Sequence, residues 1–270
     1  MQGGVSLAAF EAGSRRPDAA TVVLVHGLGH WTQAAWDFVG AALEPTHRIV
    51  AFDLPGFGAS AKPDRAYPLH FFASALQAVV ADFSLERFTL VGHSLGGLIA
   101  ALYASAQPAR VGLLALVDPA GFLRSPKLLA RILGSDLLAG VLPHVRPSRR
   151  FVHKTFENAV YEPSSVEPWM HAQMWELARD AAMIRAFVRV YRDARPDFLD
   201  LPRLHASLAR YRGPALIVWG KHDRYVPIRA LEKARRVYPQ AAVTVFERCG
   251  HCPNLEFPEA LSARLIAAGA

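Results

Sequence analysis

A serine set among glycines, in the run Gly92-His93-Ser94-Leu95-Gly96, is the strongest chemical signal in the sequence. It follows an apolar run and precedes an amphipathic one. A tight strand-to-helix turn projects a serine hydroxyl from the edge of a sheet, and flanking glycines remove Cβ atoms that would crowd the turn. The N-terminus of the following helix directs N–H groups toward developing negative charge. The pattern predicts that Ser94 is a nucleophile, and this context disfavours a glycine-rich turn with an incidental serine.

A serine nucleophile needs a general base and a group that orients the base. His251 follows the last apolar run and precedes the last helical run, and Asp223 follows the apolar run 215–220. Side chains at the C-terminal ends of parallel strands gather at one sheet edge, which favours His251 over the other histidines. The chain order Ser94, Asp223, His251 is typical of this nucleophile turn. Asp118, after the run 111–118, is the rival acid, and we favour Asp223.

Two backbone N–H groups are expected to stabilise the oxyanion. The first is that of Leu95, directly after the nucleophile. The second is that of Leu28, in the loop His26-Gly27-Leu28-Gly29, where glycines allow a close approach of the backbone. We expect His26 itself to be structural.

Short apolar runs separated by amphipathic segments organise most of the chain. Runs of this length indicate parallel strands that are buried on both faces. The predicted strands are Thr21–His26, Arg48–Asp53, Phe88–Gly92, Val111–Asp118, Ala215–Gly220 and Ala242–Glu247, and the predicted helices are Leu95–Ala106, Pro227–Tyr238 and Pro258–Ala268. The sequence therefore predicts an α/β fold with a mostly parallel sheet that helices cover on both faces.

The segment 122–212 interrupts this rhythm and reads as a helical cap inserted into a core domain of residues 1–121 and 213–270. Apolar residues at steps of four and three predict one long helix that stops before Pro196. They are Met170, Met174, Leu177, Ala181, Ile184, Val188 and Tyr191. A second helical stretch is predicted at Lys127–Leu142. Candidate substrate contacts in the cap are Met174, Trp175 and Leu128, because methionine and aromatic side chains suit an acyl or aryl group.

The net charge of +7 is concentrated in the same region, since residues 119–214 hold 15 Lys and Arg against 9 Asp and Glu. A solvated face is the ordinary explanation for cap residues such as Arg146, Arg149 and Arg150. The alternative is attraction of anionic substrates or of an anionic membrane surface. We expect no nucleic-acid partner, because no nucleic-acid-binding motif accompanies the charge.

Composition excludes several other classes. The chain has 270 residues, 52% of them hydrophobic, which suits one large domain with an insertion. No apolar run is long enough to span a membrane and the N-terminus has no secretory pattern, so a cytoplasmic protein is expected. Cys249 and Cys252 flank His251 as C-x-x-C, but no second ligand pair or redox context accompanies them. We interpret them as packing residues and expect neither a metal nor a cofactor.

Together these motifs resemble the α/β-hydrolase family. The matching segments are residues 26–29, DLPGFGAS at 53–60, GHSLGG at 92–97, GKHD at 220–223 and GHCPNLEFPE at 250–259. The resemblance implies an eight-stranded, mostly parallel sheet with one antiparallel strand, and a lid over the active site. One strand is plausible before residue 20, at Val5–Phe10, so the family's first strand is expected to be missing or rudimentary.

The residues at the nucleophile turn narrow the reaction. Family members that open haloalkanes or epoxides use aspartate where this chain has Ser94, and carbon–carbon bond hydrolases of aromatic degradation usually carry asparagine where it has His93. Histidine there resembles many esterases and lipases. We rank hydrolysis of small to medium, apolar carboxylic esters or thioesters first. A carbon–carbon hydrolase of a diketo acid, using cap arginines for the carboxylate, is second, and a non-catalytic small-molecule receptor is third.

Overall fold

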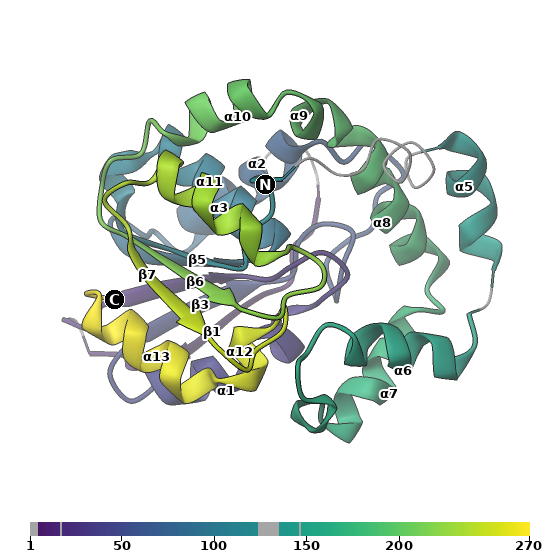
Figure 1. The fold of residues 1–270 in the computed structure, drawn as a ribbon, viewed down its shortest axis with the longest axis horizontal. Helices are drawn as coiled ribbons and strands as arrows, with labels where there is room; N and C mark the ends of the chain where they lie inside the picture. Colours follow the sequence, from purple (N-terminus) through teal and green to yellow (C-terminus); the bar gives the residue numbers. More distant parts are fainter. Residues whose placement is uncertain (1–4, 17, 124–134, 146) are drawn as a thin grey trace.

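A seven-stranded sheet forms the centre of the computed structural model, which describes residues 5–16, 18–123, 135–145 and 147–270 (Figure 1). The strand order is β1-β3-β2-β4-β5-β6-β7, and every neighbouring pair is parallel except β1 and β3. The strands are β1 (Ala9–Gly13), β2 (Thr21–Val25), β3 (Arg48–Phe52), β4 (Phe88–His93), β5 (Val111–Val117), β6 (Ala215–Gly220) and β7 (Ala242–Phe246). The six strands predicted from apolar runs are thus confirmed to within a residue or so at each end.

The sheet is covered on both faces because its strands alternate between two apolar cores. In β2, Val23 and Val25 pack into the core beneath one helical layer, whereas Val22 and Leu24 pack into the other. Figure 1 shows the two layers above and below the sheet. One layer holds α1 (Thr32–Leu43), α12 (Pro253–Glu256) and α13 (Pro258–Ala267), and the other holds α2 (Leu69–Asp82), α3 (Leu95–Ala106), α10 (Leu201–Leu208) and α11 (Leu231–Val237).

The N-terminal strand differs from the prediction. It covers Ala9–Gly13 instead of Val5–Phe10, and it pairs antiparallel with β3 from Ala9 opposite Phe52 to Gly13 opposite Arg48. The preceding residues bond instead to the turn after β3, where Ser6 and Ala8 carbonyls accept from the N–H groups of Ala61 and Asp53. Within the described residues the sheet therefore has seven strands, where the resemblance implied eight.

Helices connect β5 to β6 throughout the described residues of this segment. They are α5 (Asp136–Val141), α6 (Arg149–Glu157), α7 (Pro168–Leu177), α8 (Ala181–Asp193), α9 (Arg195–Leu199) and α10, and short 3₁₀ turns lie at Leu142–His144 and Pro163–Ser165. Two further 3₁₀ turns lie in the rest of the chain, at Pro108–Arg110 and Ile228–Ala230. The predicted helix at Lys127–Leu142 falls partly outside the described residues, and α5 covers its end.

The single long helix predicted through Met170 and Tyr191 is wrong, because the structure breaks it into α7 and α8. The Asp180 carboxylate accepts hydrogen bonds from the N–H groups of Ala182, at 2.9 Å, and Met183, at 3.2 Å. An aspartate in this position caps a helix N-terminus, so a new helix begins where the apolar period continues. The apolar spacing persisted through the break, and for that reason it concealed the break.

Two apolar clusters join the inserted segment to the rest of the chain. Met183, Ala186 and Val190 of α8 join the large core above the sheet, and α10 packs against α3. The helices α6 and α7 form a separate cluster that includes Phe156 and Met170 and reaches Leu255 beside the last helices. No helix in the described part of the chain is long and apolar enough to cross a membrane.

Candidate active site

Ser94 lies on the sharp turn between β4 and α3, with φ +53° and ψ −118°. A positive φ is strained for any residue other than glycine. The turn is possible because its neighbours are glycines. A Cβ on Gly92 would collide with the carbonyl of Gly96, and a Cβ on Gly96 would collide with the carbonyls of Val25 and His26. The predicted strand-to-helix turn is therefore present, with its crowding relieved as the sequence indicated.

The structure brings Ser94, His251 and Asp223 together from three separate loops at the C-terminal edge of the sheet. Ser94 Oγ lies 3.0 Å from His251 Nε2, and Asp223 Oδ2 lies 2.7 Å from His251 Nδ1. Asp223 Oδ1 accepts two further bonds, from the N–H groups of Tyr225 and Val226. These bonds fix the carboxylate, so the imidazole presents Nε2 to the serine. The arrangement can transfer the serine proton to histidine as the hydroxyl attacks.

The loop that carries His251 is bonded to the inserted helical segment. The N–H of His251 donates to the carbonyl of Ala159 at 2.6 Å. The Glu256 carboxylate accepts from the N–H groups of Gly250, at 2.7 Å, and of Tyr161, at 2.6 Å. A Cβ on Gly250 would strike the backbone of residues 159–161, so this contact requires glycine. The position of the general base therefore depends on the segment 159–161.

Asp118, the rival acid, lies beside the triad in a different state. Its side chain is fully buried, and its Oδ1 accepts from the N–H of Gly220 at 2.9 Å. Burial, followed by the nearby Asp223 carboxylate, raises the pKa of Asp118 well above its usual value. Burial thus favours the neutral form of Asp118, and Asp223 is the carboxyl group bonded to the imidazole.

Asp118, Asp223 and His251 place potential metal-ligand atoms within 4.8 Å of one another. Asp223 Oδ2 and His251 Nδ1 already satisfy each other, and a protonated Asp118 is a poor ligand. The donor set fits a proton-transfer triad better than a metal site.

The loop predicted to hold one oxyanion donor lies directly against the nucleophile. A Cβ on Gly27 would meet His93 Nδ1 at 2.9 Å and Ser94 Cβ at 3.1 Å. The N–H of Leu28 belongs to this loop. Leu95 is the first residue of α3, where backbone N–H groups have no helical acceptor. Both predicted donors are therefore near Ser94, and their role in catalysis remains a prediction.

Three histidines around the triad were not assigned catalytic or supporting contacts from the sequence. His93 Nε2 donates to the carbonyl of His251 at 2.6 Å, and the two rings lie 4.8 Å apart. His26 accepts the N–H of Leu54 through Nε2, at 2.8 Å, which ties the oxyanion loop to the 53–60 turn and fits its expected structural role. His30 packs edge-on against His93. The sequence shows that residue 93 is a histidine, but it does not show the hydrogen bond of this histidine to the His251 carbonyl, which lies 158 residues away.

These buried histidines predict acid sensitivity of the fold. Burial lowers the pKa of His26 and His93 below the ordinary 6.5, and that of His30 to about 3. The unfolded chain protonates them near pH 6.5 while the folded chain does not, so each removes about 1.4 kcal/mol of stability per pH unit below that point. The raised pKa of Asp118 offsets the effect of one histidine. The folded chain keeps a carboxyl proton that the unfolded chain loses, so this group stabilises the fold as the pH falls.

Because three buried histidines outweigh one buried carboxyl group, the free energy of unfolding should fall between about pH 7 and about pH 5.5. Urea titrations at the two pH values measure it. In His30→Phe, the fall should be smaller by about 1 kcal/mol, because one proton no longer distinguishes the two states. An equal fall in both proteins would contradict the assignment of His30 as a buried neutral group.

The predicted substrate contacts in the cap have other neighbours. Met174 packs on the α6–α7 cluster beside Trp169, and the Trp175 ring lies 5.9 Å from Arg149 and 5.7 Å from Arg179. Leu128 lies outside the described residues. Two aromatic side chains approach the site instead: a Cβ on Gly29 would meet the ring of Phe187 of α8 at 3.2 Å, and the Tyr225 ring lies 5.5 Å from His251.

A cavity of about 630 Å³ lies between α1, the strands β1 and β3, and the end of α7, and is lined by Trp31, Trp36, Ile49 and Leu177, among others. Ser94 and His251 do not line it.

The cysteines that flank His251 are both free and buried, and burial raises the pKa of each thiol. Both are therefore protonated and unreactive, which agrees with the packing interpretation.

The fold and the serine turn define the class of this protein. Residues 20–258 match the model of the α/β-hydrolase fold family, and the chain belongs to that family. Its general activity is that of a hydrolase.

Individual relatives are similar over most of the chain. A 2-hydroxy-6-oxononadienedioate/2-hydroxy-6-oxononatrienedioate hydrolase of Pseudomonas putida is 30% identical over 250 residues, covering 89% of this chain and 84% of that protein. Among solved structures, a 2-hydroxy-6-oxo-6-phenylhexa-2,4-dienoate hydrolase from Rhodococcus sp. strain RHA1 has a TM-score of 0.82 at 25% identity, covering 98% of this chain and 95% of the other. A bacterial membrane phospholipase A has a TM-score of 0.78 at 29% identity, covering 98% and 82%.

Proposed function

We propose that this protein hydrolyses carboxylic esters or thioesters of small to medium, apolar substrates through an acyl-enzyme on Ser94. The observation that carries the proposal is the continuous hydrogen-bonded series from Ser94 Oγ through His251 to Asp223. A serine with a bonded imidazole and a fixed carboxylate is suited to acyl transfer.

In the proposed mechanism, Ser94 Oγ attacks the acyl carbon while His251 Nε2 takes its proton. The N–H groups of Leu28 and Leu95 stabilise the oxyanion. The leaving alcohol or thiol then takes the proton from His251, and the acyl group stays on Ser94. Water attacks this ester with the same base, which regenerates the serine. Throughout, Asp223 orients the imidazole and stabilises its positive charge.

The surroundings of the serine favour an apolar substrate. Phe187 and Tyr225 approach the site, and Ala186 of α8 packs near the 53–60 turn. Two arginines, Arg224 beside Asp223 in the sequence and Arg189 on α8, have partners elsewhere. Arg224 donates to Asn158 Oδ1 at 3.3 Å, and Arg189 bonds to the carbonyl of Arg65 at 3.1 Å. These contacts occupy two side chains that a substrate carboxylate would otherwise use.

A second candidate is the hydrolysis of a carbon–carbon bond in a diketo acid. The similarity to the Pseudomonas putida and Rhodococcus hydrolases favours it, since their names describe dienoate substrates of this kind. The same triad and oxyanion donors would serve that reaction. His93, where carbon–carbon hydrolases usually carry asparagine, favours the ester reaction.

A direct comparison of the two substrate classes tests the proposal. We expect multiple turnover of p-nitrophenyl esters, with kcat/KM rising by up to about fourfold per added CH₂ until the acyl pocket is full. We expect a lower kcat/KM for a 2-hydroxy-6-oxo-dienoate. Higher kcat/KM on the dienoate would replace the ester proposal by the second candidate. Tight binding of an ester without turnover would instead favour a receptor on this fold.

A further inference from the structure

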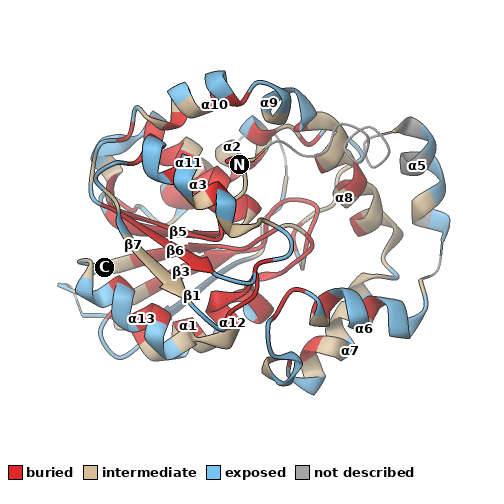
Figure 2. Ribbon diagram, viewed as in Figure 1, coloured by how far each residue is buried: buried red, intermediate tan, exposed pale blue. Residues whose placement is uncertain are grey.

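The inserted segment exposes apolar side chains on α5 and in the connection after it, and on α6 it exposes an apolar side chain beside cationic ones. We name as the cap edge the residues Leu137, Val141, Val145, Arg150, Phe151 and Lys154, which belong to α5, to α6 and to the connection between them. Figure 1 shows these elements at the side of the molecule that is remote from the sheet, and in Figure 2 much of α5 and α6 is exposed.

The apolar members are exposed to an unusual degree for such large side chains. Leu137 is 76% exposed, Phe151 65%, Val141 48% and Val145 47%. Scattered single apolar residues on a surface need no explanation, but four within 15 positions of one connected segment do. Exposure of these side chains to water is unfavourable in free energy, and their transfer into an apolar environment would remove this penalty.

The helix α6 separates its two faces clearly. Val152 and Phe156 are buried against α7, and Arg150, Phe151 and Lys154 fall within about 100° of one another on the outer face. Within the part of the chain that the structure describes, Arg150 and Lys154 form no ion pair. Their charges are therefore available to a partner.

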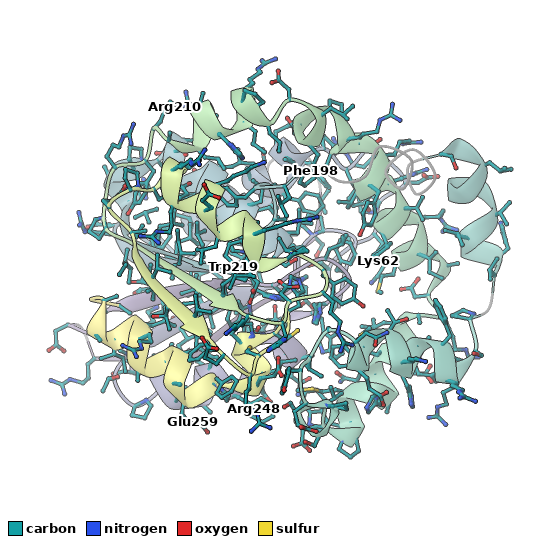
Figure 3. All side chains as sticks on the ribbon, in the orientation of Figure 1. Lys62, Phe198, Arg210, Trp219, Arg248 and Glu259 are labelled. Atoms are coloured by element: carbon teal, nitrogen blue, oxygen red, sulfur yellow. The ribbon has the colours of Figure 1, made fainter. Side chains whose placement is uncertain are left out.

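Further cationic groups lie next to this face. Arg149, Arg150, Lys154 and Arg224 share the lining of a cavity of about 680 Å³, in which Glu157 is the acidic side chain. In Figure 3, side chains project outward from the part of the ribbon that Figure 1 labels α6. The local charge is thus positive over the cavity and the outer face of α6.

We propose that the cap edge docks on an anionic phospholipid bilayer. Exposed apolar side chains on α5 and α6, together with the lysine and arginine of α6, match such a surface, because phosphate oxygens attract the cations while the acyl region takes up the apolar groups. A nucleic acid would complement the charge but would leave Leu137 and Val141 without an apolar partner. The proposal concerns attachment, and it does not depend on which bond the active site breaks.

Vesicle sedimentation of the full-length protein tests this docking. We expect the wild type to bind mixed phosphatidylcholine–phosphatidylglycerol vesicles, to release them at high salt, and to bind pure phosphatidylcholine vesicles weakly. The double substitution Arg150→Glu/Lys154→Glu should lower the partition coefficient more than about a hundredfold, at about fivefold per unit of charge. Phe151→Ala should lower it about tenfold.

Matched controls separate this surface from net charge and general apolarity. Arg235→Glu/Arg264→Glu changes the net charge equally, on exposed positions of α11 and α13, and should retain most of the binding. Ile266→Ala removes an apolar side chain that is 48% exposed on α13 and should also retain it. Leu137→Ala serves as a second apolar variant of the cap edge. Thermal unfolding of each variant verifies that the fold is intact.

The other outcomes overturn the proposal. Failure of the wild type to sediment with anionic vesicles would reject bilayer docking. Equal losses in the two charge-reversal pairs would show that net charge, and not the cap edge, governs binding. Self-association in analytical ultracentrifugation that Phe151→Ala abolishes, without vesicle binding, would assign the cap edge to a second copy of the chain.

Discussion

Replacing Ser94 with alanine should lower kcat for ester hydrolysis by about four to six orders of magnitude. The substitution removes the hydroxyl that is placed to attack, since Ser94 Oγ lies 3.0 Å from His251 Nε2. The positive φ at this position is present in both proteins, so stability should change little. Steady-state kinetics on a p-nitrophenyl ester, with thermal unfolding in parallel, measures both quantities.

The matched control is Ser74→Ala, which removes an exposed hydroxyl from α2 and should leave kcat within about twofold of the wild type. Retention of more than about one tenth of the activity by folded Ser94→Ala would show that another group or bound water attacks the substrate. That result would contradict the acyl-enzyme.

Replacing Asp223 with asparagine should lower kcat by about four orders of magnitude. An amide cannot stabilise the imidazolium, and its N–H would favour the wrong tautomer of His251. The equivalent change at Asp118 should cost less than about tenfold, because a buried carboxyl that is already neutral resembles an amide in shape and charge. The pair of variants therefore compares a carboxyl group that is bonded to His251 with a neighbouring carboxyl group that is bonded to Gly220.

Kinetics of Asp223→Asn and Asp118→Asn under identical conditions checks this contrast. Equal losses in the two variants would mean that the carboxyl groups act as one unit and share the negative charge. A larger loss in Asp118→Asn would reverse the assignment of the acid. The free energy of unfolding of each variant is measured in parallel, so that a loss of folded protein is distinguished from a loss of kcat.

Much of the core could be predicted from local patterns. Six strands and the turn at Ser94 follow from apolar runs bounded by glycine and aspartate, which are short-range signals. The convergence of Ser94, Asp223 and His251 follows from a geometric rule, namely that parallel strands end at a common edge. None of these inferences required knowledge of a specific contact between distant residues.

Contacts between distant segments could not be predicted in this way. The break at Asp180 leaves the apolar period unchanged, so only the capping bonds reveal it. The bond from His93 to the His251 carbonyl and the neutral state of Asp118 both depend on burial created by the whole fold. Met174 and Trp175 were selected for their chemistry, and their neighbours depend on how α6 and α7 pack.

The hydrogen bonds between the His251 loop and residues 159–161 couple the position of the inserted segment to the alignment of the catalytic base. The Ala159 carbonyl and the Tyr161 N–H are tied to the same loop that aligns the imidazole with Ser94. Any swing of the inserted segment that separated these residues from the core would also pull the base away from the nucleophile. A molecule opened at this junction would therefore be unable to cleave until the junction closed again.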